Sequence, residues 1–135
     1  MLRCFIIDDN RRFLDAARAL LEREGITVVG VASSAAEALE RAEELRPDVT
    51  LVDIRLGEQS GFDVARQLHG RASLAGSRTV LISTHAEEDY ADLIAASPAI
   101  GFLPKAVLSA RAIRDMLGLP GDGDGIGSVS GPRGK

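Results

Sequence analysis

Apolar residues follow two alternating patterns along the chain. Short runs rich in bulky aliphatic residues, such as 26–31, are typical of strands that are buried in a parallel sheet. Between these runs, apolar residues recur every three or four positions, as Leu14, Ala17 and Leu21 do, which is typical of a helix with one buried face. The pattern predicts strands at 2–7, 26–31, 48–53, 79–83 and 99–103, and helices at 11–24, 34–46, 61–69, 86–97 and 106–117.

This order of elements predicts an α/β fold made of five strand–helix units. Strands that alternate with helices favour a five-stranded parallel sheet with helices on both faces. Right-handed crossovers leave few topologies, and the flavodoxin-like strand order 2-1-3-4-5 is the natural candidate. Segments 54–60 and 71–77 are expected to be loops. In the fourth helix, Tyr90, Leu93 and Ile94 are expected to face inward.

Polar side chains follow the predicted strands at their carboxyl ends. Asp8 and Asp9 follow the first strand, Asp53 ends the third, Ser83 ends the fourth, and Lys105 follows the fifth. In the order 2-1-3-4-5 these four strands are neighbours, so their end groups converge on one edge of the sheet. Ligands of open α/β sheets bind beyond that edge, beside the first strand. The sequence therefore predicts one site built from these five residues.

Composition bounds the class of protein. The chain has 135 residues, of which 45% are hydrophobic and 27% charged, as expected for one globular domain. A net charge of −4 disfavours direct binding to nucleic acid or to an anionic membrane. Cys4 is the single cysteine, which excludes an intrachain disulfide and fits a cytoplasmic location. We expect the folded domain at 1–118 and a disordered tail, rich in Gly, Ser, Asp and Pro, at 119–135.

The predicted site has a specific chemistry. Three neighbouring carboxylates repel one another, and burial would raise their pKa values. Lys105 supplies one positive charge, and a hard divalent cation with oxygen ligands, best Mg²⁺, would supply the rest. One carboxylate of such a cluster can attack phosphorus to form an aspartyl phosphate. A hydroxyl and an ammonium beside it would bind the phosphoryl oxygens.

This constellation resembles the receiver domain of two-component response regulators. The resemblance covers residues 1 to about 118. It is carried by Ile6-Ile7-Asp8-Asp9, the stretch 48–53, Gly61, Val80-Leu81-Ile82-Ser83 and Gly101-Phe102-Leu103-Pro104-Lys105. It implies that Asp53 is the phosphoacceptor and that the chain is a signalling domain, not an enzyme, apart from self-catalysed acceptance and hydrolysis of the phosphoryl group.

The resemblance also implies roles for the surrounding residues. Asp8 and Asp9 would hold Mg²⁺ with Asp53, Asp9 being the more direct ligand, and the backbone carbonyl of Arg55 would be a further ligand. Ser83 would be the switch hydroxyl, Lys105 would contact the phosphoryl group, and Phe102 stands at the position of an aromatic rotamer switch. The candidates for tuning the rate of hydrolysis are Arg55, Thr84 and His85.

Three positions depart from the usual family pattern. Gly57 stands where proline is usual, Thr84 where alanine or glycine is usual, and Ala106 where many members have proline. None of these residues removes a chemical group from the site. In having Ala106 after Lys105, the chain resembles the subfamily whose receivers precede helix-turn-helix output domains.

The resemblance implies a sensor histidine kinase or phosphotransfer protein as phosphoryl donor and an unknown output protein, with homodimerisation as a further possibility. Three alternatives stay open: a phosphatase or phosphotransferase of the haloacid dehalogenase class, a vestigial receiver that binds without phosphorylation, and a receiver fragment of a helix-turn-helix DNA-binding regulator. The dehalogenase signature wants an acid two residues after the nucleophile. Asn10 and Arg55 occupy those positions, which disfavours the enzyme.

Overall fold

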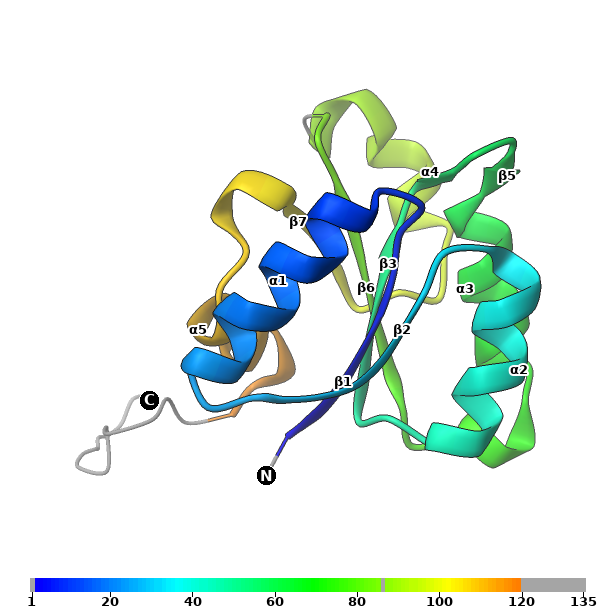
Figure 1. Ribbon diagram of the computed structural model, residues 1–135. Coiled ribbons are helices and arrows are strands. Elements are labelled where there is room, and N and C mark those ends of the chain that lie inside the picture. Colours follow the sequence, from blue (N-terminus) through cyan, green and yellow to red (C-terminus); the bar gives the residue numbers. More distant parts are fainter. Residues whose placement is uncertain (1, 86, 120–135) are drawn as a thin grey trace.

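The computed structural model of the protein describes residues 2–85 and 87–119, and its centre is a five-stranded parallel sheet (Figure 1). The order β2-β1-β3-β6-β7 corresponds to 2-1-3-4-5 when the sheet strands alone are counted, which confirms the predicted topology. All neighbouring strands run parallel. The strands are β1 (Arg3–Ile7), β2 (Thr27–Ala32), β3 (Val49–Asp53), β6 (Arg78–Ser83) and β7 (Gly101–Pro104).

Helices cover both faces of the sheet, as predicted. One face packs against α1 (Arg11–Arg23) and α5 (Ala110–Leu117), and the other against α2 (Ala35–Leu45), α3 (Gly61–His69) and α4 (Ala91–Ala95) (Figure 1). Each face therefore has its own apolar layer, and residues of β1 and β3 contribute to both. None of the described helices is long and apolar enough to cross a membrane.

Polar side chains fix where the helices begin. Asn10, Ser34, Ser60 and Ser109 each accept a hydrogen bond from a backbone N–H in the first turn of the helix that follows. Such caps satisfy N–H groups that have no partner within the helix. The second helix ends as predicted before Pro47, with Arg46 in the left-handed region at φ 47°.

The helix predicted at 86–97 is wrong in extent. Glu87–Tyr90 forms a 3-10 turn, η2, and only the five residues of α4 are α-helical, while Ala86 lies outside the described residues. Tyr90, which precedes α4, provides no side-chain cap, and three adjacent acids occupy the turn before it. So short a helix cannot present a full apolar face. Tyr90 and Ile94 pack on the core as predicted, but Leu93 is 53% exposed.

The last helix begins later than predicted. Lys105–Val107 forms a 3-10 turn, η3, and Leu108 is extended and buried, so that α5 begins at Ala110. Ser109 accounts for this start, because its side chain accepts a hydrogen bond from the Ala112 N–H. Two predicted loops also contain regular structure. They hold the hairpin of β4 (Arg55–Leu56) and β5 (Gln59–Ser60) and the 3-10 turn η1 (Ala72–Leu74).

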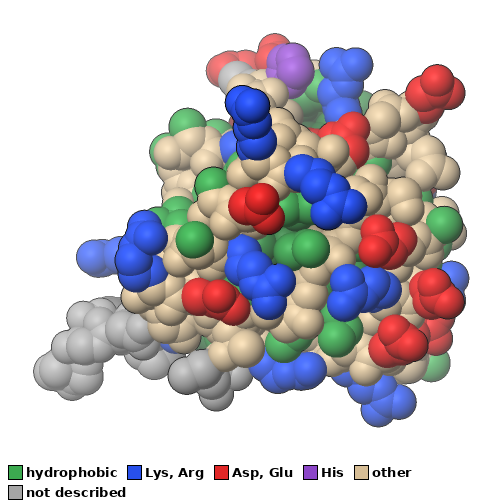
Figure 2. Space-filling view, viewed as in Figure 1, with side chains coloured by type: hydrophobic (Ala, Val, Ile, Leu, Met, Phe, Trp, Pro, Cys, Tyr) green, Lys and Arg blue, Asp and Glu red, His purple; other side chains and the backbone are tan. Residues whose placement is uncertain are grey.

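Cys4 is a core residue. It is fully buried in β1, and burial raises the pKa of its thiol to about 12. On the face shown in Figure 2, basic and acidic side chains are interspersed rather than gathered into one patch of a single sign. The predicted tail at 119–135 lies, beyond residue 119, outside the described residues, so the boundary at 118 stays a prediction.

Candidate functional site

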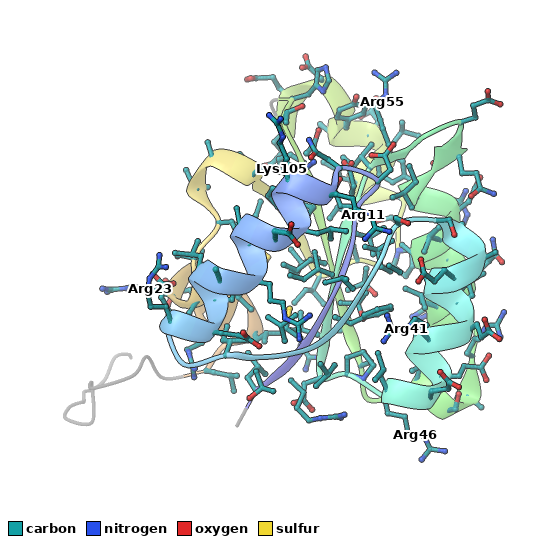
Figure 3. The ribbon with its side chains drawn as sticks, in the orientation of Figure 1. Arg11, Arg23, Arg41, Arg46, Arg55 and Lys105 are labelled. Atoms are coloured by element: carbon teal, nitrogen blue, oxygen red, sulfur yellow. The ribbon has the colours of Figure 1, made fainter. Side chains whose placement is uncertain are left out.

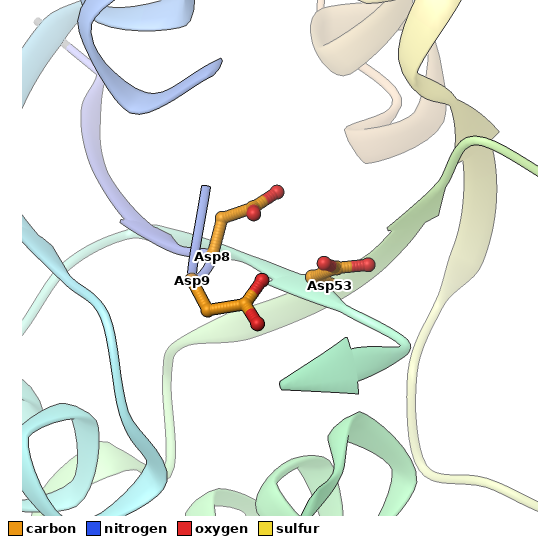
Figure 4. A group of neighbouring side chains, drawn as sticks. All are labelled: Asp8, Asp9 and Asp53. Carbon is orange, nitrogen blue, oxygen red and sulfur yellow. The ribbon is translucent and has the colours of Figure 1, made fainter. Parts of the chain in front are cut away.

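Three carboxylates meet at the carboxyl edge of the sheet. Asp8 and Asp9 follow β1, and Asp53 is the last residue of the neighbouring β3 (Figure 4). One carboxylate oxygen from each lies within 4.8 Å of the others. The two aspartates from β1 and the one from β3 come together because parallel neighbours end at the same edge, as the sequence predicted.

Asp8 is the most enclosed of the three. Its side chain is fully buried, and its Oδ1 accepts a hydrogen bond of 2.8 Å from the Asn10 N–H. Its Oδ2 lies 2.5 Å from Nζ of Lys105. A buried carboxylate needs such partners, because an ion without them is costly to remove from water. Lys105 is thus the residue that allows Asp8 to stay buried at this edge.

Asp9 is exposed and binds the hairpin that follows β3. Its Oδ2 accepts a hydrogen bond of 2.9 Å from the Gly57 N–H. Gly57 has φ +61°, a left-handed conformation that glycine adopts readily, and it is the first of the two residues that join β4 to β5. Glycine, at a position where the family usually has proline, therefore suits a tight turn whose N–H donates to Asp9.

Asp53 has a raised pKa. Burial is the largest cause and the charge of Asp8 adds to it, while Lys105 and the N–H of Arg55 oppose it, which together bring the pKa from 3.8 to about 6. Its Oδ2 lies 3.4 Å from Nζ of Lys105, and its Oδ1 accepts a 3.3 Å hydrogen bond from the Arg55 N–H. The Asp53 carboxylate is therefore mostly ionised at neutral pH, and it takes up a proton at a higher pH than an ordinary aspartate does.

Gly61 allows the helix α3 to start against the backbone of Asp53. A Cβ atom at this position would lie 2.0 Å from the carbonyl oxygen of Asp53 and 2.8 Å from Cα of Ile54. The Gly61 N–H also donates a 2.7 Å hydrogen bond to the carbonyl of Ile54. Gly61, which the sequence singled out only by resemblance, thus closes the loop that positions the end of β3.

Lys105 follows β7, which in the sheet order is the strand farthest from β1 among those that supply the site. Its side chain is 12% exposed and contacts Asp8 and Asp53. Its ammonium also lies 4.5 Å from the centre of the Phe13 ring. Phe13 belongs to the first turn of α1, within the helix predicted at 11–24, and was not predicted as a residue of the site. Its place one turn beyond Asp9, at the same edge, is the signal that could have indicated it.

Ser83 ends β6, as predicted, and is 2% exposed. Its Oγ accepts a hydrogen bond of 2.9 Å from the His85 N–H. Thr84 and His85 are both exposed, and the His85 ring meets Tyr90 edge-on at 6.1 Å. The hydroxyl thus lies at the predicted edge, on the strand that neighbours the one bearing Asp53.

Phe102 is not part of the charged cluster. It is 6% exposed and belongs to the apolar layer beneath α2, α3 and α4. Arg55 is exposed and meets the site through its backbone, and Figure 3 shows its side chain at the same end of the molecule as Lys105. Of the residues predicted for the site, Asp8, Asp9 and Asp53 bring carboxylate oxygens within 4.8 Å of one another, and Lys105 contacts Asp8 and Asp53.

The donor set suits a small divalent cation. Three carboxylates carry a formal charge of −3 when ionised, and the ammonium of Lys105 offsets only one of these charges. Oxygen ligands that are partly exposed, as Asp9 is, match the preference of Mg²⁺ for carboxylates together with water. The fold and site thus define a doubly wound α/β domain with an acidic, cation-compatible site and a lysine at its carboxyl edge.

The comparisons with known proteins agree with this class. The family model "Response regulator receiver domain" matches residues 4–117. The transcriptional regulatory protein YvfU of Bacillus subtilis is 35% identical over 106 residues, which cover 78% of this chain and 52% of that protein. The signal receiver domain of NarL from Mycobacterium tuberculosis is 31% identical with a TM-score of 0.74, and the match covers 84% of this chain and 94% of that one.

A further solved structure is a response regulator from Burkholderia pseudomallei with a phosphorylated aspartic acid, a calcium ion and citrate. It is 26% identical, with a TM-score of 0.74, over 87% of this chain and 66% of that one. Taken together, the matches show that this chain belongs to the response regulator receiver domain family of two-component signal transduction. The chain spans about half the length of the curated relatives it matches.

Proposed function

We propose that this receiver domain accepts a phosphoryl group on Asp53, with Mg²⁺ bound at the acidic cluster. One observation carries the proposal. Asp8, Asp9 and Asp53 bring carboxylate oxygens within 4.8 Å of one another, and Asp53 also contacts Lys105. The Burkholderia relative, whose structure holds a phosphorylated aspartic acid and a divalent cation, supports the same chemistry for this chain. A phosphohistidine of a sensor histidine kinase or phosphotransfer protein is the proposed donor.

The transfer step forms one bond and breaks one. Oδ of ionised Asp53 attacks phosphorus, and the phosphorus–nitrogen bond of the donor breaks with its electron pair going to the imidazole. A divalent cation held by Asp8, Asp9, Asp53 and the carbonyl of Arg55 would neutralise charge on the phosphoryl oxygens. Water attack on the aspartyl phosphate reverses the modification, and Arg55, Thr84 and His85 are the residues that we propose tune its rate.

Lys105 and Ser83 would respond to the new charge. The Lys105 ammonium, 3.4 Å from Oδ2 of Asp53, would contact the phosphoryl oxygens. Ser83 would exchange its hydrogen bond with the His85 N–H for one to the phosphoryl group, and Phe102 would follow in the adjacent strand. These shifts would bias the surface of α4, β7 and α5 toward binding an output protein or a second copy of the chain.

A second candidate concerns the output. The relatives named as transcriptional regulators match this chain over about half of their length. This favours a receiver that controls a DNA-binding part of the same protein, in keeping with the helix-turn-helix alternative. The site chemistry is the same in both cases.

The phosphoacceptor role is tested with Asp53→Asn. Incubation with phosphoramidate and Mg²⁺ should add a phosphoryl group to the unaltered chain, seen by intact-mass spectrometry, and none to the variant. The matched control is Asp63→Asn, because Asp63 is an exposed acid of α3 that pairs with Arg66 away from the site. Equal labelling of Asp53→Asn and the unaltered chain would refute the proposal, and no labelling of either would favour the vestigial alternative.

The output is tested with fluoroberyllate, which mimics the phosphoryl group, in the presence of Mg²⁺. The oligomeric mass is measured by light scattering with and without the mimic. A doubling of mass would support a switched contact between copies of the chain. An unchanged mass together with a changed far-UV spectrum would support a monomer that acts on another protein, and no change in either property would contradict a switch.

A further inference from the structure

The ammonium of Lys105 is enclosed on three sides, and one of them is aromatic. Asp8 Oδ2 lies at 2.5 Å, Asp53 Oδ2 at 3.4 Å, and the Phe13 ring centre at 4.5 Å. The face of an aromatic ring carries negative potential and attracts a cation within about 6 Å of its centre. Low exposure strengthens this attraction, because less water competes for the cation, and the Lys105 side chain is only 12% exposed.

The backbone of Phe13 is linked to the acidic site through Asn10. The backbone N–H of Phe13 donates to Oδ1 of Asn10 at 3.1 Å, which caps α1. The N–H of Asn10 donates in turn to Oδ1 of Asp8 at 2.8 Å. Contacts therefore run in a closed cycle from Asp8 to Asn10, Phe13, Lys105 and back to Asp8. The beginning of α1 and the lysine after β7 are held together through this cycle.

We propose that Phe13 is a positioning residue that holds the Lys105 ammonium over the phosphoacceptor by a cation–π contact. This inference rests on the proposed function of Asp53. A third carboxylate in place of the ring would bind the lysine through its N–H groups. The ring attracts the charge alone and leaves the three N–H donors available to Asp8, Asp53 and an arriving phosphoryl oxygen. Phe13 therefore keeps Lys105 near the reaction without competing for it.

The alternative role of Phe13 is apolar packing, since its side chain also lies against the core layer beneath α1 and α5. Fluorination separates the two roles, because it weakens the cation–π attraction stepwise while the ring keeps nearly the same size. Phe13 is replaced by mono-, di- and trifluorophenylalanine, and the rate of phosphoramidate labelling is measured. We expect a graded loss that reaches about threefold to tenfold. Phe13→Tyr should retain the rate and Phe13→Leu should lose it.

The matched control is the same series at Phe5, a fully buried ring on the opposite face of the sheet. Fluorination there should leave the labelling rate unchanged, and urea unfolding of every variant excludes loss of the fold as the cause. A labelling rate that stays constant across the Phe13 series would overturn the proposal and leave packing as the role of the ring.

A second measurement needs no phosphorylation. Lys105 and Lys135 are the only lysines of the chain, so lysine labelled with ¹³C at Cε gives one signal from the described part. The Phe13 ring should shift the Lys105 signal upfield, and Phe13→Leu should abolish the shift. An unshifted Lys105 signal in the unaltered chain would refute the contact itself. Labelling that persists in Asp53→Asn would instead refute the phosphoacceptor role, so the two failures are distinguishable.

Discussion

Replacing Asp53 by asparagine should stabilise the fold at neutral pH. Asp53 is 7% exposed, and its ionised form is disfavoured mainly by burial and then by the neighbouring Asp8. Asparagine has nearly the same shape and no charge, so it resembles the protonated aspartic acid. The substitution therefore removes a cost that the native chain carries at its site in the absence of a cation.

The magnitude follows from the pKa. The pKa of Asp53 rises from 3.8 in the unfolded chain to about 6 in the folded one. A pKa difference of one corresponds to about 1.4 kcal/mol. The difference predicts a cost of about 3 kcal/mol once the pH is above 6. Between pH 4 and 6 the folded state binds more protons at Asp53 than the unfolded state does. The free energy of unfolding should therefore fall as pH rises through this window.

Urea unfolding between pH 4 and pH 8, with a chelator present, measures the effect. Circular dichroism is the suitable probe because the chain has no tryptophan. Asp53→Asn should exceed the unaltered chain by about 3 kcal/mol at pH 8 and match it near pH 4. Asp63→Asn, at an exposed ion pair, should change stability by less than about 1 kcal/mol at every pH. A difference for Asp53→Asn that does not depend on pH would refute the reasoning.

Three further predictions concern the cation and two glycines. At a hundredfold excess over Kd, Mg²⁺ should raise the free energy of unfolding of the unaltered chain by about 2.7 kcal/mol, seen as a higher urea midpoint, and should raise it much less in Asp53→Asn. Equal effects on both chains would contradict binding at the acidic cluster. Gly61→Ala should lower the free energy of unfolding by about 2 kcal/mol or more, because the new Cβ would lie 2.0 Å from the carbonyl oxygen of Asp53. Gly70→Ala should be tolerated in the same urea assay, because its Cβ would have no neighbour nearer than 3.6 Å. Gly57→Ala should cost about 1 kcal/mol because of its φ of +61°, while Gly76→Ala, with open space around its Cβ, should be neutral or slightly stabilising; similar values for the two would argue against a constrained turn.

Local patterns were sufficient for most of the architecture. Bulky apolar runs set the strands, and helical spacing set the faces of α1, α2 and α3, because both periodicities follow from backbone geometry. The convergence of Asp8, Asp53 and Lys105 was also predictable, since each stands at the carboxyl end of a strand and parallel neighbours share that edge. The extent of the fourth and fifth helices was not, because the spacing of apolar residues does not distinguish the 3-10 turns at Glu87–Tyr90 and Lys105–Val107 from the first turn of an α-helix.

The sequence by itself therefore determined the positions of the strands and made 2-1-3-4-5 their natural order, which indicated the edge at which the acids and the lysine meet. The tertiary structure alone decided how these groups are held. Lys105 and Asp53 are 52 positions apart, and no periodic pattern predicts which carboxylate the ammonium approaches more closely or that Phe13 lies against it. Distances of this kind depend on how α1 and the turn after β7 pack against a common sheet, and packing couples residues that the sequence separates.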